Sequence, residues 1–444
     1  MHSRAFTGTM RRRLEEYFEF ATLNTTWRNE LLAGFTTFVT MAYIIFVNPS
    51  ILKDAGMPQG AVTVATCLSA ALGSILMGAY ARYPIALAPG MGLNAYFAYT
   101  VVQGMGVDWR VALGAVFFSG VAFLALTLAG LRRMILEAIP REMYASVAAG
   151  IGLFIAFIGM KNCGFIAASP ATLVAIGNLG DPQTLLAAFG LILIAALMVW
   201  QVPAAMLLGI LGTAGLGLLM RIVPWAPQDS DLTAIAETMG MLDLSGALRL
   251  GLLEIIFVFL FVDLFDNIGT LIGVGKRAGL FDDAQNIPRL QRILTTDSVA
   301  TIAGSLAGTS TVVSYIESAA GVAAGGRSGV TAVVAGVLFL VAAFVAPAVG
   351  GIPSSATGPA LIIVGSLMMA HVGEIDWKDP LLAVPSFLTM ISIPLTFSIA
   401  NGLAIGFIAY TALKLARGEF REINPLVYLL TALFLLRFLY LGGE

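Results

Sequence analysis

Residues 84–94 read PIALAPGMGLN, and this stretch interrupts an otherwise apolar part of the chain. Pro89 cannot continue a regular helix, and Gly90 and Gly92 leave the backbone accessible. We therefore expect residues 85–88 to be extended and Pro89 to open a half-helix in the middle of a membrane. Irregular backbone is tolerated at membrane depth only where it is buried in protein or lines a cavity, and paired interruptions are typical of transporter binding sites.

The surrounding sequence has the composition of a polytopic membrane protein. Of its 444 residues, 58% are hydrophobic and 11% are charged, whereas soluble domains are about 45–50% apolar and about 25% charged. A soluble fold is thereby excluded. A formal net charge of -2 leaves no basic surface for nucleic acid. Cys67 and Cys163 lie in apolar stretches and are expected in the core, and His2 and His371 are too few for a metal site.

Apolar windows long enough to cross a bilayer recur along the chain and predict an all-α fold with fourteen spans. Their approximate ranges are 30–49, 60–80, 85–103, 111–130, 142–160, 183–200, 203–222, 250–275, 292–306, 311–325, 329–347, 356–371, 381–397 and 399–416. A last apolar run, 426–441, contains Arg437 and is expected either to lie in the interface or to pack at the end of the bundle. Lys and Arg gather in the loops that would place both termini in the cytoplasm.

The two halves of the chain, on either side of the loop 224–249, have related sequences. Four short matches occur in the same order: residues 52–56 with 275–279, 113–118 with 335–340, 139–140 with 352–353, and 181–182 with 379–380. Because each half has seven predicted spans, the second copy would be inverted, as in many secondary transporters. The offset between the copies places Glu317 opposite Asn94, inside a second interruption, residues 308–321 (GTSTVVSYIESAAG).

Three acidic residues stand out inside the predicted spans. Asp263 and Asp266 are three positions apart, hence on one face of a helix, and Glu317 lies in the second interruption. A carboxylate at the centre of a span costs about 2.5–3.5 kcal/mol, so such residues are rare and usually functional. No Lys or Arg lies inside these two spans to pair with them. Together with Thr270, one turn after Asp266, they predict a polar centre.

Acids, an amide and the free N–H groups of half-helices suit a flat neutral ring. A carboxylate can accept the N1–H of guanine or hypoxanthine, and an amide suits the N6/N7 edge of adenine. Six aromatic residues are candidates to stack on such a ring: Phe35, Phe38, Tyr43, Tyr96, Phe97 and Tyr315. The alternatives are a passive channel or facilitator for small polar solutes and an intramembrane enzyme, and the sequence lacks the residue pairs that hydrolysis would need.

Four longer motifs resemble the AzgA-like permeases, proton-coupled purine transporters of the nucleobase:cation symporter-2 superfamily. The motifs are residues 36–49 (TTFVTMAYIIFVNP), 88–97 (APGMGLNAYF), 263–274 (DLFDNIGTLIGV) and 315–322 (YIESAAGV). The resemblance covers nearly the whole chain from residue 26 onward. Pyrimidine and xanthine members usually carry Glu and His where this chain has Asp266 and Thr270, so the role of that His does not transfer.

The resemblance implies the uracil-permease type of fold, with two inverted repeats and strand-like segments opening spans 3 and 10. A core would comprise residues 30–130 and 250–347, and a gate residues 131–223 and 348–417, with 1–29, 224–249 and 418–444 outside both. It also implies import of adenine, guanine and hypoxanthine by proton symport across the plasma (inner) membrane, without a cofactor. The core would move against the gate, through which a homodimer would form.

The resemblance further assigns residues to the site. Asp266 and Glu317 would bind the base and couple the proton. Asp263, judged from its position in the span alone, is expected to act either in helix packing or as a proton relay in the coupling. The remaining substrate contacts would be Asn94, Thr270, Ile316, Met91 and Thr40, with Gly90 and Gly92 exposing the half-helix backbone.

Overall fold

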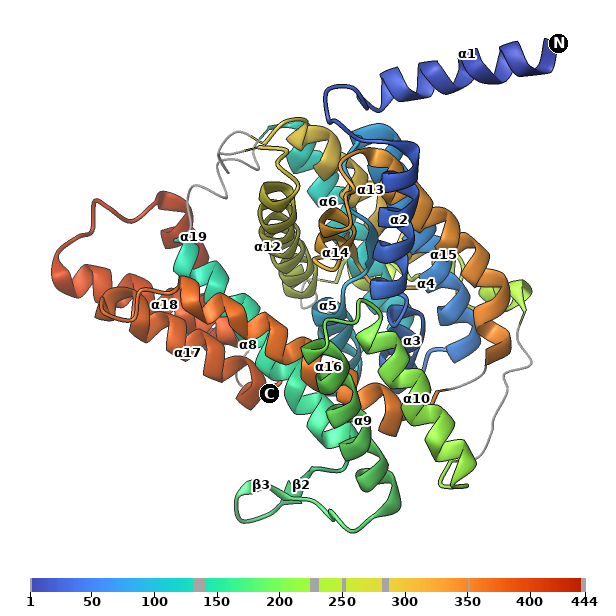
Figure 1. Cartoon of the computed structure of the whole chain (residues 1–444). Coiled ribbons are helices and arrows are strands. Elements are labelled where there is room, and N and C mark those ends of the chain that lie inside the picture. Colours follow the sequence, from blue (N-terminus) through green and yellow to red (C-terminus); the bar gives the residue numbers. More distant parts are fainter. Residues whose placement is uncertain are drawn as a thin grey trace.

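The computed structural model describes residues 2–130, 140–223, 231–249, 253–281, 287–349 and 352–440. In these residues the chain is mostly helical, and α1 (His2–Tyr17) projects away from the bundle (Figure 1). Eight helical segments are long and apolar enough to cross a membrane, and four shorter apolar helices accompany them. The prediction of a polytopic helical membrane protein is therefore confirmed. Residue 139 and the expected boundaries at 131, 224 and 250 lie outside the described residues.

In the first half of the chain, helices alternate with short irregular elements. These are α2 (Trp27–Met41), α3 (Ile44–Asp54), α4 (Gln59–Leu76), the π-helical η1 (Met77–Ala81), β1 (Leu87–Pro89), α5 (Met91–Ala95), the π-helical η2 (Tyr96–Gly104), α6 (Trp109–Leu128), α8 (Arg141–Asn162), β2 (Ile166–Ser169), β3 (Leu173–Ile176), α9 (Pro182–Val199) and α10 (Ala205–Leu219).

The second half follows a similar order. Its elements are η3 (Leu232–Glu237), α11 (Leu244–Ala247), α12 (Leu253–Arg277), α13 (Leu290–Ala307), β4 (Val312–Ser314), α14 (Ser318–Ala323), α15 (Gly329–Val349), α16 (Ser354–Met368), η5 (Met369–Glu374), α17 (Pro380–Thr396), α18 (Ile399–Arg417) and α19 (Pro425–Tyr440).

Two helices of the matched halves begin in the same way. The side chain of Asp181 accepts hydrogen bonds from the first free N–H groups of α9, and Asp379 does the same for α17. In each case a proline, Pro182 or Pro380, takes the first helical position, where no N–H is needed. The two Asp-Pro pairs that match in sequence therefore begin their helices in the same way.

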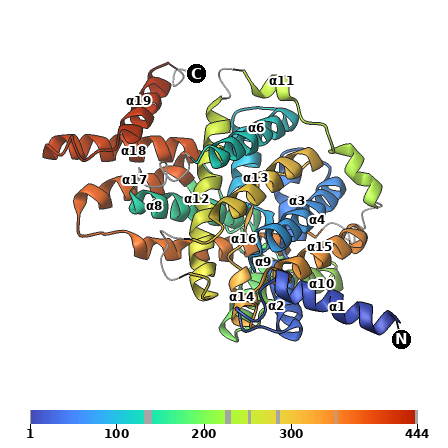
Figure 2. The ribbon, with the colours of Figure 1, turned by 90° about the horizontal axis from the view of Figure 1, so that it is seen from above.

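Helices of the two halves pack on each other in corresponding combinations. In one part of the molecule α4 packs on α15 and α13 packs on α6, and in the other part α8 packs on α16 and α17. Figure 2 shows α8, α17 and α18 gathered on one side of α12, and α3, α4, α13 and α15 on the other. Cys67 and Cys163 are both free and buried, as predicted.

The two interruptions meet as a pair of antiparallel strands. Leu87 of β1 lies opposite Ser314 of β4, and Pro89 lies opposite Val312. Both predicted extended segments are therefore present. The half-helix α5 begins two residues later than expected, at Met91, because Pro89 is the last residue of the strand.

The first predicted span is broken, which the sequence did not indicate. Helix α2 ends at Met41 and α3 begins at Ile44. Tyr43 lies in the break and is fully buried. Residues 42 and 43 keep helical backbone angles, so α2 and α3 follow one another in one apolar segment, Trp27–Asp54.

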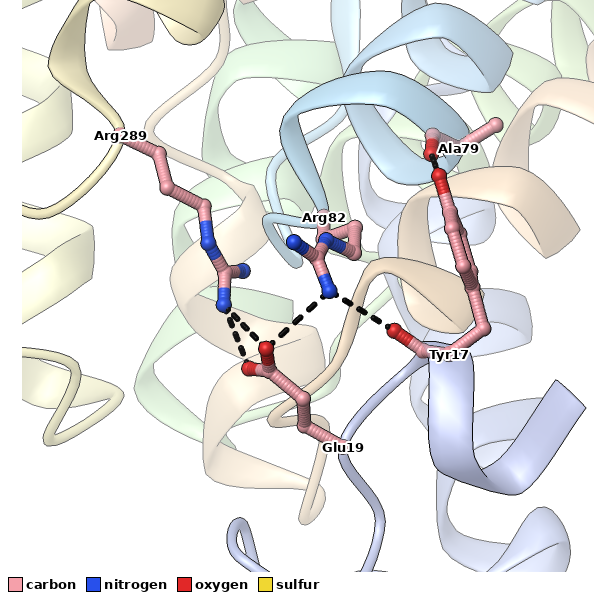
Figure 3. Close-up of polar contacts among 5 residues, drawn as sticks. All are labelled: Tyr17, Glu19, Ala79, Arg82 and Arg289. Atoms are coloured by element: carbon pink, nitrogen blue, oxygen red, sulfur yellow. Dashed lines mark hydrogen bonds and ion pairs between the residues drawn. The ribbon is translucent and has the colours of Figure 1, made fainter. Parts of the chain in front are cut away.

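The segment after α1 is tied to the ends of two other helices (Figure 3). Glu19 accepts hydrogen bonds from Arg82 Nη1 at 3.1 Å and from Arg289 Nη2 at 2.5 and 2.6 Å. Arg82 also donates to the carbonyl of Tyr17, whose hydroxyl donates to the carbonyl of Ala79. One carboxylate thereby joins the residues that follow η1 to those that precede α13.

The last apolar run forms α19 and packs on the bundle. It runs back along α18, because Thr431 Oγ1 lies 2.8 Å from Thr411 Oγ1 and Arg437 Nη1 donates to Asn401 Oδ1 at 2.8 Å. Arg437 also forms an ion pair with Glu254 at the start of α12. The end of α19 therefore lies beside the start of α18, which does not fit a C-terminus on the side where α18 ends.

Candidate functional site

The starts of α5 and α14 are held together by backbone hydrogen bonds. Gly90 N–H donates to the carbonyl of Thr311 at 2.9 Å, and Tyr315 N–H donates to the carbonyl of Ala86 at 3.0 Å. The hydroxyl of Tyr315 adds a bond to the carbonyl of Pro89 at 2.5 Å. A Cβ atom at position 90 would lie 2.8 Å from Val313 Cγ2, so the close approach of the strands requires glycine there.

Hydroxyl side chains of the flanking helices hold each strand in the same manner. Ser74 of α4 both donates to the carbonyl of Leu87 and accepts from its N–H. Thr301 of α13 makes the same two bonds to Val312 of β4. These bonds satisfy buried backbone groups that a short strand leaves unpaired.

Glu317 stands at the N-terminus of α14. Its Oε1 accepts a hydrogen bond from the hydroxyl of Tyr43 at 2.5 Å. Asp266 lies on α12, which packs on both β4 and α14. Both acids are partly exposed, and Ile316 beside Glu317 is 53% exposed. The structure thus places the two acids that the sequence selected on two elements that pack together, with an accessible apolar side chain beside Glu317.

Asp263 has different surroundings from Asp266, although both are on α12. The Nδ2 group of Asn267 donates to Asp263 Oδ1 at 3.0 Å and to Asp297 Oδ2 at 2.6 Å. Asn267 Oδ1 accepts from the N–H of Ser314 at 2.8 Å. Asp263 is 1% exposed. It belongs to a buried network behind β4, whereas Asp266 is accessible.

Asp297 was missed by the sequence reasoning. It lies inside the predicted span 292–306, so the argument that selected Asp266 also applies to it. Its carboxylate shares the Asn267 amide with Asp263, and Asp297 is fully buried on α13.

Asn94 faces the inside of the protein. Its Nδ2 donates to Asn48 Oδ1 at 2.6 Å, and Asn48 Nδ2 donates in turn to Thr66 Oγ1 at 2.7 Å and Thr309 Oγ1 at 2.9 Å. Asn94 is 0% exposed. This buried network joins α3 and α4 to the half-helix α5 and to Thr309, three residues before β4. Asn48, a polar residue inside the first predicted span, was also missed.

The other expected contacts are largely covered by protein. Thr270, Met91 and Thr40 are 7–8% exposed. Thr40 Oγ1 donates to carbonyls of its own helix, which leaves its hydrogen committed. Gly92 touches α8: a Cβ atom there would lie 2.6 Å from Ile151 Cγ2. Position 92 is therefore a point of contact between α5 and the helices on the other side of the molecule.

Most of the aromatic candidates are engaged elsewhere. Phe38 packs on Phe339, and Tyr96 and Phe97 pack on Phe259. The hydroxyls of the two remaining tyrosines make the hydrogen bonds described above. What the site offers is therefore carboxylate acceptors and the exposed apolar side chain of Ile316, which suits a neutral solute with N–H groups.

Comparison with known proteins gives three findings. The sequence profile of the permease family matches residues 28–405. The guanine/hypoxanthine permease PbuG of Bacillus subtilis (strain 168) is 47% identical over 440 residues, which cover 96% of this chain and 100% of that protein. The adenine permease AdeP of Escherichia coli (strain K12) is 45% identical over 431 residues, 97% of either chain.

A solved structure has a similar fold. The transmembrane domain of the cyanobacterial bicarbonate transporter BicA superposes with a TM-score of 0.65, covering 86% of this chain and 98% of that domain. The two sequences are 12% identical, so this similarity concerns the fold alone.

Proposed function

The chain belongs to the permease family, whose members are membrane transporters and not enzymes, and we propose that it carries purine nucleobases across the membrane. The observation that carries this proposal is the similarity, over nearly the whole chain, to an adenine permease and a guanine/hypoxanthine permease. The acids and the exposed Ile316 near the paired strands support a flat, neutral, N–H-bearing substrate such as adenine, guanine or hypoxanthine.

In the proposed complex the base lies against Glu317, Asp266 and Ile316. The carboxylates accept N–H groups of the ring, and the exposed Ile316 packs on its face. The backbone at Gly90 and Gly92 closes the site. The proposed site also includes Asn94, Thr270, Met91 and Thr40. The Asn94 amide and the Thr40 hydroxyl donate hydrogen bonds inside the protein. Asn94 would therefore act by supporting the half-helix α5, and Thr40 by supporting α2.

We further propose that a proton enters with the base. Among the described residues, no Lys or Arg forms an ion pair with Glu317 or Asp266, so neither carboxylate is held in its charged form by such a partner. Either acid could therefore take up the proton, with Asp263 as a further participant in coupling. A pH difference of one unit would supply about 1.4 kcal/mol to drive uptake.

Alternating access would follow from movement of a core, residues 30–130 and 250–347, against a gate, residues 131–223 and 348–417. Fourteen spans in two inverted repeats are part of this proposal. It is supported by the corresponding packing of α4 on α15 and of α13 on α6, and by the identical roles of Ser74 and Thr301. The gate would also provide the homodimer interface.

We place the N-terminus and the Lys- and Arg-rich loops in the cytoplasm, with the protein in the plasma (inner) membrane. The C-terminus is not assigned to that side, because α19 returns along α18.

The decisive experiment is uptake of radiolabelled purine by liposomes that contain the purified protein. With the interior made alkaline, adenine, guanine and hypoxanthine should accumulate and should compete with one another, and uracil should not compete. Glu317→Gln and Asp266→Asn should each lower accumulation by about tenfold or more, because each removes an anionic acceptor. Glu237→Gln, at an exposed position in η3, is the matched control and should have no effect.

Each part of the proposal can be refuted separately. Uptake no greater than in empty liposomes would refute purine transport. Accumulation that persists with an uncoupler would refute proton symport while leaving purine transport intact. A passive channel would be favoured by an uptake rate that never saturates, together with an internal purine concentration that never exceeds the outside one.

A further inference from the structure

The break in the first predicted span places one tyrosine against the proposed substrate acid. Tyr43 lies between α2 and α3, is 0% exposed, and is 274 positions from Glu317 in the sequence. Its hydroxyl donates to Glu317 Oε1 at 2.5 Å. This distance is in the range of about 2.5–2.7 Å that is typical of an O–H donor bound to a carboxylate.

Tyr43 is the only side chain among the described residues that donates a hydrogen bond to Glu317. A glutamate side chain has several rotatable bonds, and holding it in one rotamer costs conformational entropy. A rigid donor lowers this cost for a ligand, because the carboxylate is ordered before the ligand arrives. With Oε1 bound to Tyr43, Oε2 keeps its full capacity to accept hydrogen bonds from a ligand.

Tyr43 is itself well fixed. Its ring is among the largest fully buried side chains of the protein and is part of the main hydrophobic cluster. The neighbouring Tyr315 cannot take its place, because the hydroxyl of Tyr315 is committed to the carbonyl of Pro89.

We propose that Tyr43 is a positioning residue, whose hydroxyl holds the Glu317 carboxylate so that Oε2 faces the purine. This inference rests on the proposed function, since it gives Glu317 a substrate to bind. It assigns to Tyr43 a role different from that of a ring stacked on the base.

The test is a double-mutant cycle read by binding of labelled purine to the purified protein. Tyr43→Phe removes one oxygen and keeps the buried ring, so the melting temperature should stay close to that of the wild type. Its dissociation constant should rise about tenfold, the loss expected for a hydrogen bond to a charged group. In the Glu317→Gln background the same substitution should have no further effect.

Tyr99→Phe is the matched control. It removes a similar bond, from Tyr99 Oη to Asp54 Oδ2 at 2.7 Å, at a carboxylate outside the site. Its purine affinity should remain within twofold of the wild type.

The outcomes are distinguishable. A wild-type protein that does not bind purine refutes the proposed function. Wild-type binding together with unchanged affinity in Tyr43→Phe refutes the positioning role. Independent effects of Tyr43→Phe and Glu317→Gln, which multiply in the double variant, also refute it, because they would show that the hydroxyl acts other than through Glu317.

Discussion

Replacement of Glu30 should destabilise the protein more than replacement of any exposed acid. Glu30 lies in the first turn of α2 and is 0% exposed. Its Oε1 accepts from Thr25 Oγ1 at 2.7 Å and from the N–H groups of Arg327 and Ser328 at 3.0 and 3.1 Å. Its Oε2 accepts from Thr331 N–H at 3.2 Å and Thr331 Oγ1 at 2.6 Å. One buried carboxylate thus joins α2 to the start of α15.

The size of the effect follows from these five hydrogen bonds. Glu30→Gln keeps the side-chain volume but replaces one acceptor oxygen by an NH2 group. This donor would then face two or three other donors, and neither it nor they would have an acceptor. Each hydrogen bond to a charged group is worth about 1.5–3 kcal/mol, and breaking a buried charged network costs about 3–5 kcal/mol in total. We expect a loss in this range, and a further loss in Glu30→Ala from the cavity that it leaves.

Thermal unfolding of the purified protein in detergent, followed by intrinsic fluorescence, is the assay. Glu16→Gln is the control, because the Glu16 side chain on α1 is 68% exposed. The melting temperature of Glu30→Gln should fall by about 5 °C or more, whereas that of Glu16→Gln should not change. Equal melting temperatures for Glu30→Gln and the wild type would show that the network does not stabilise the contact between α2 and α15.

Two further substitutions probe other contacts. Gly92→Ala should reduce purine uptake at least tenfold without lowering the melting temperature, because its Cβ would meet Ile151 of α8 and disfavour this arrangement of the two helices. Adding Ile151→Ala should restore uptake. Failure of this second substitution to restore uptake would contradict the contact. Glu19→Gln should lower stability by about 1 kcal/mol, since the ion pairs with Arg82 and Arg289 are partly exposed. That loss should shrink in 1 M salt, and a loss that is independent of salt would rule out an electrostatic origin.

Parts of the fold could be predicted because local chemistry specifies them. Pro89, Gly90 and the β-prone residues 312–314 indicate where the helices must break. The Asp-Pro pair at 181–182 indicates the start of α9. The break at Tyr43 has no such signal: no proline or glycine lies at residues 42–43, and the side chain's partner is in the other half of the chain.

The site was predicted in part for the same reason. Acids inside apolar spans are conspicuous in a sequence, so Asp266 and Glu317 could be selected as candidates from the sequence alone. Their spacing places Asp263 and Asp266 on one face of a helix, yet Asp263 is enclosed because α13 brings Asp297 against Asn267. The placement of α13 beside α12 decides that Asp263 is enclosed while Asp266 stays accessible. The spacing of residues within α12 alone does not predict how a neighbouring helix is placed against it.

The pairing of β1 with β4 has a mechanical consequence. Because the ladder joins Leu87 to Ser314 and Pro89 to Val312, a displacement of α5 carries α14 with it. In the transport cycle proposed above, a base bound at these two short helices would therefore not be released by their separation. Release would instead require movement at the contact between α5 and α8, where Gly92 meets Ile151.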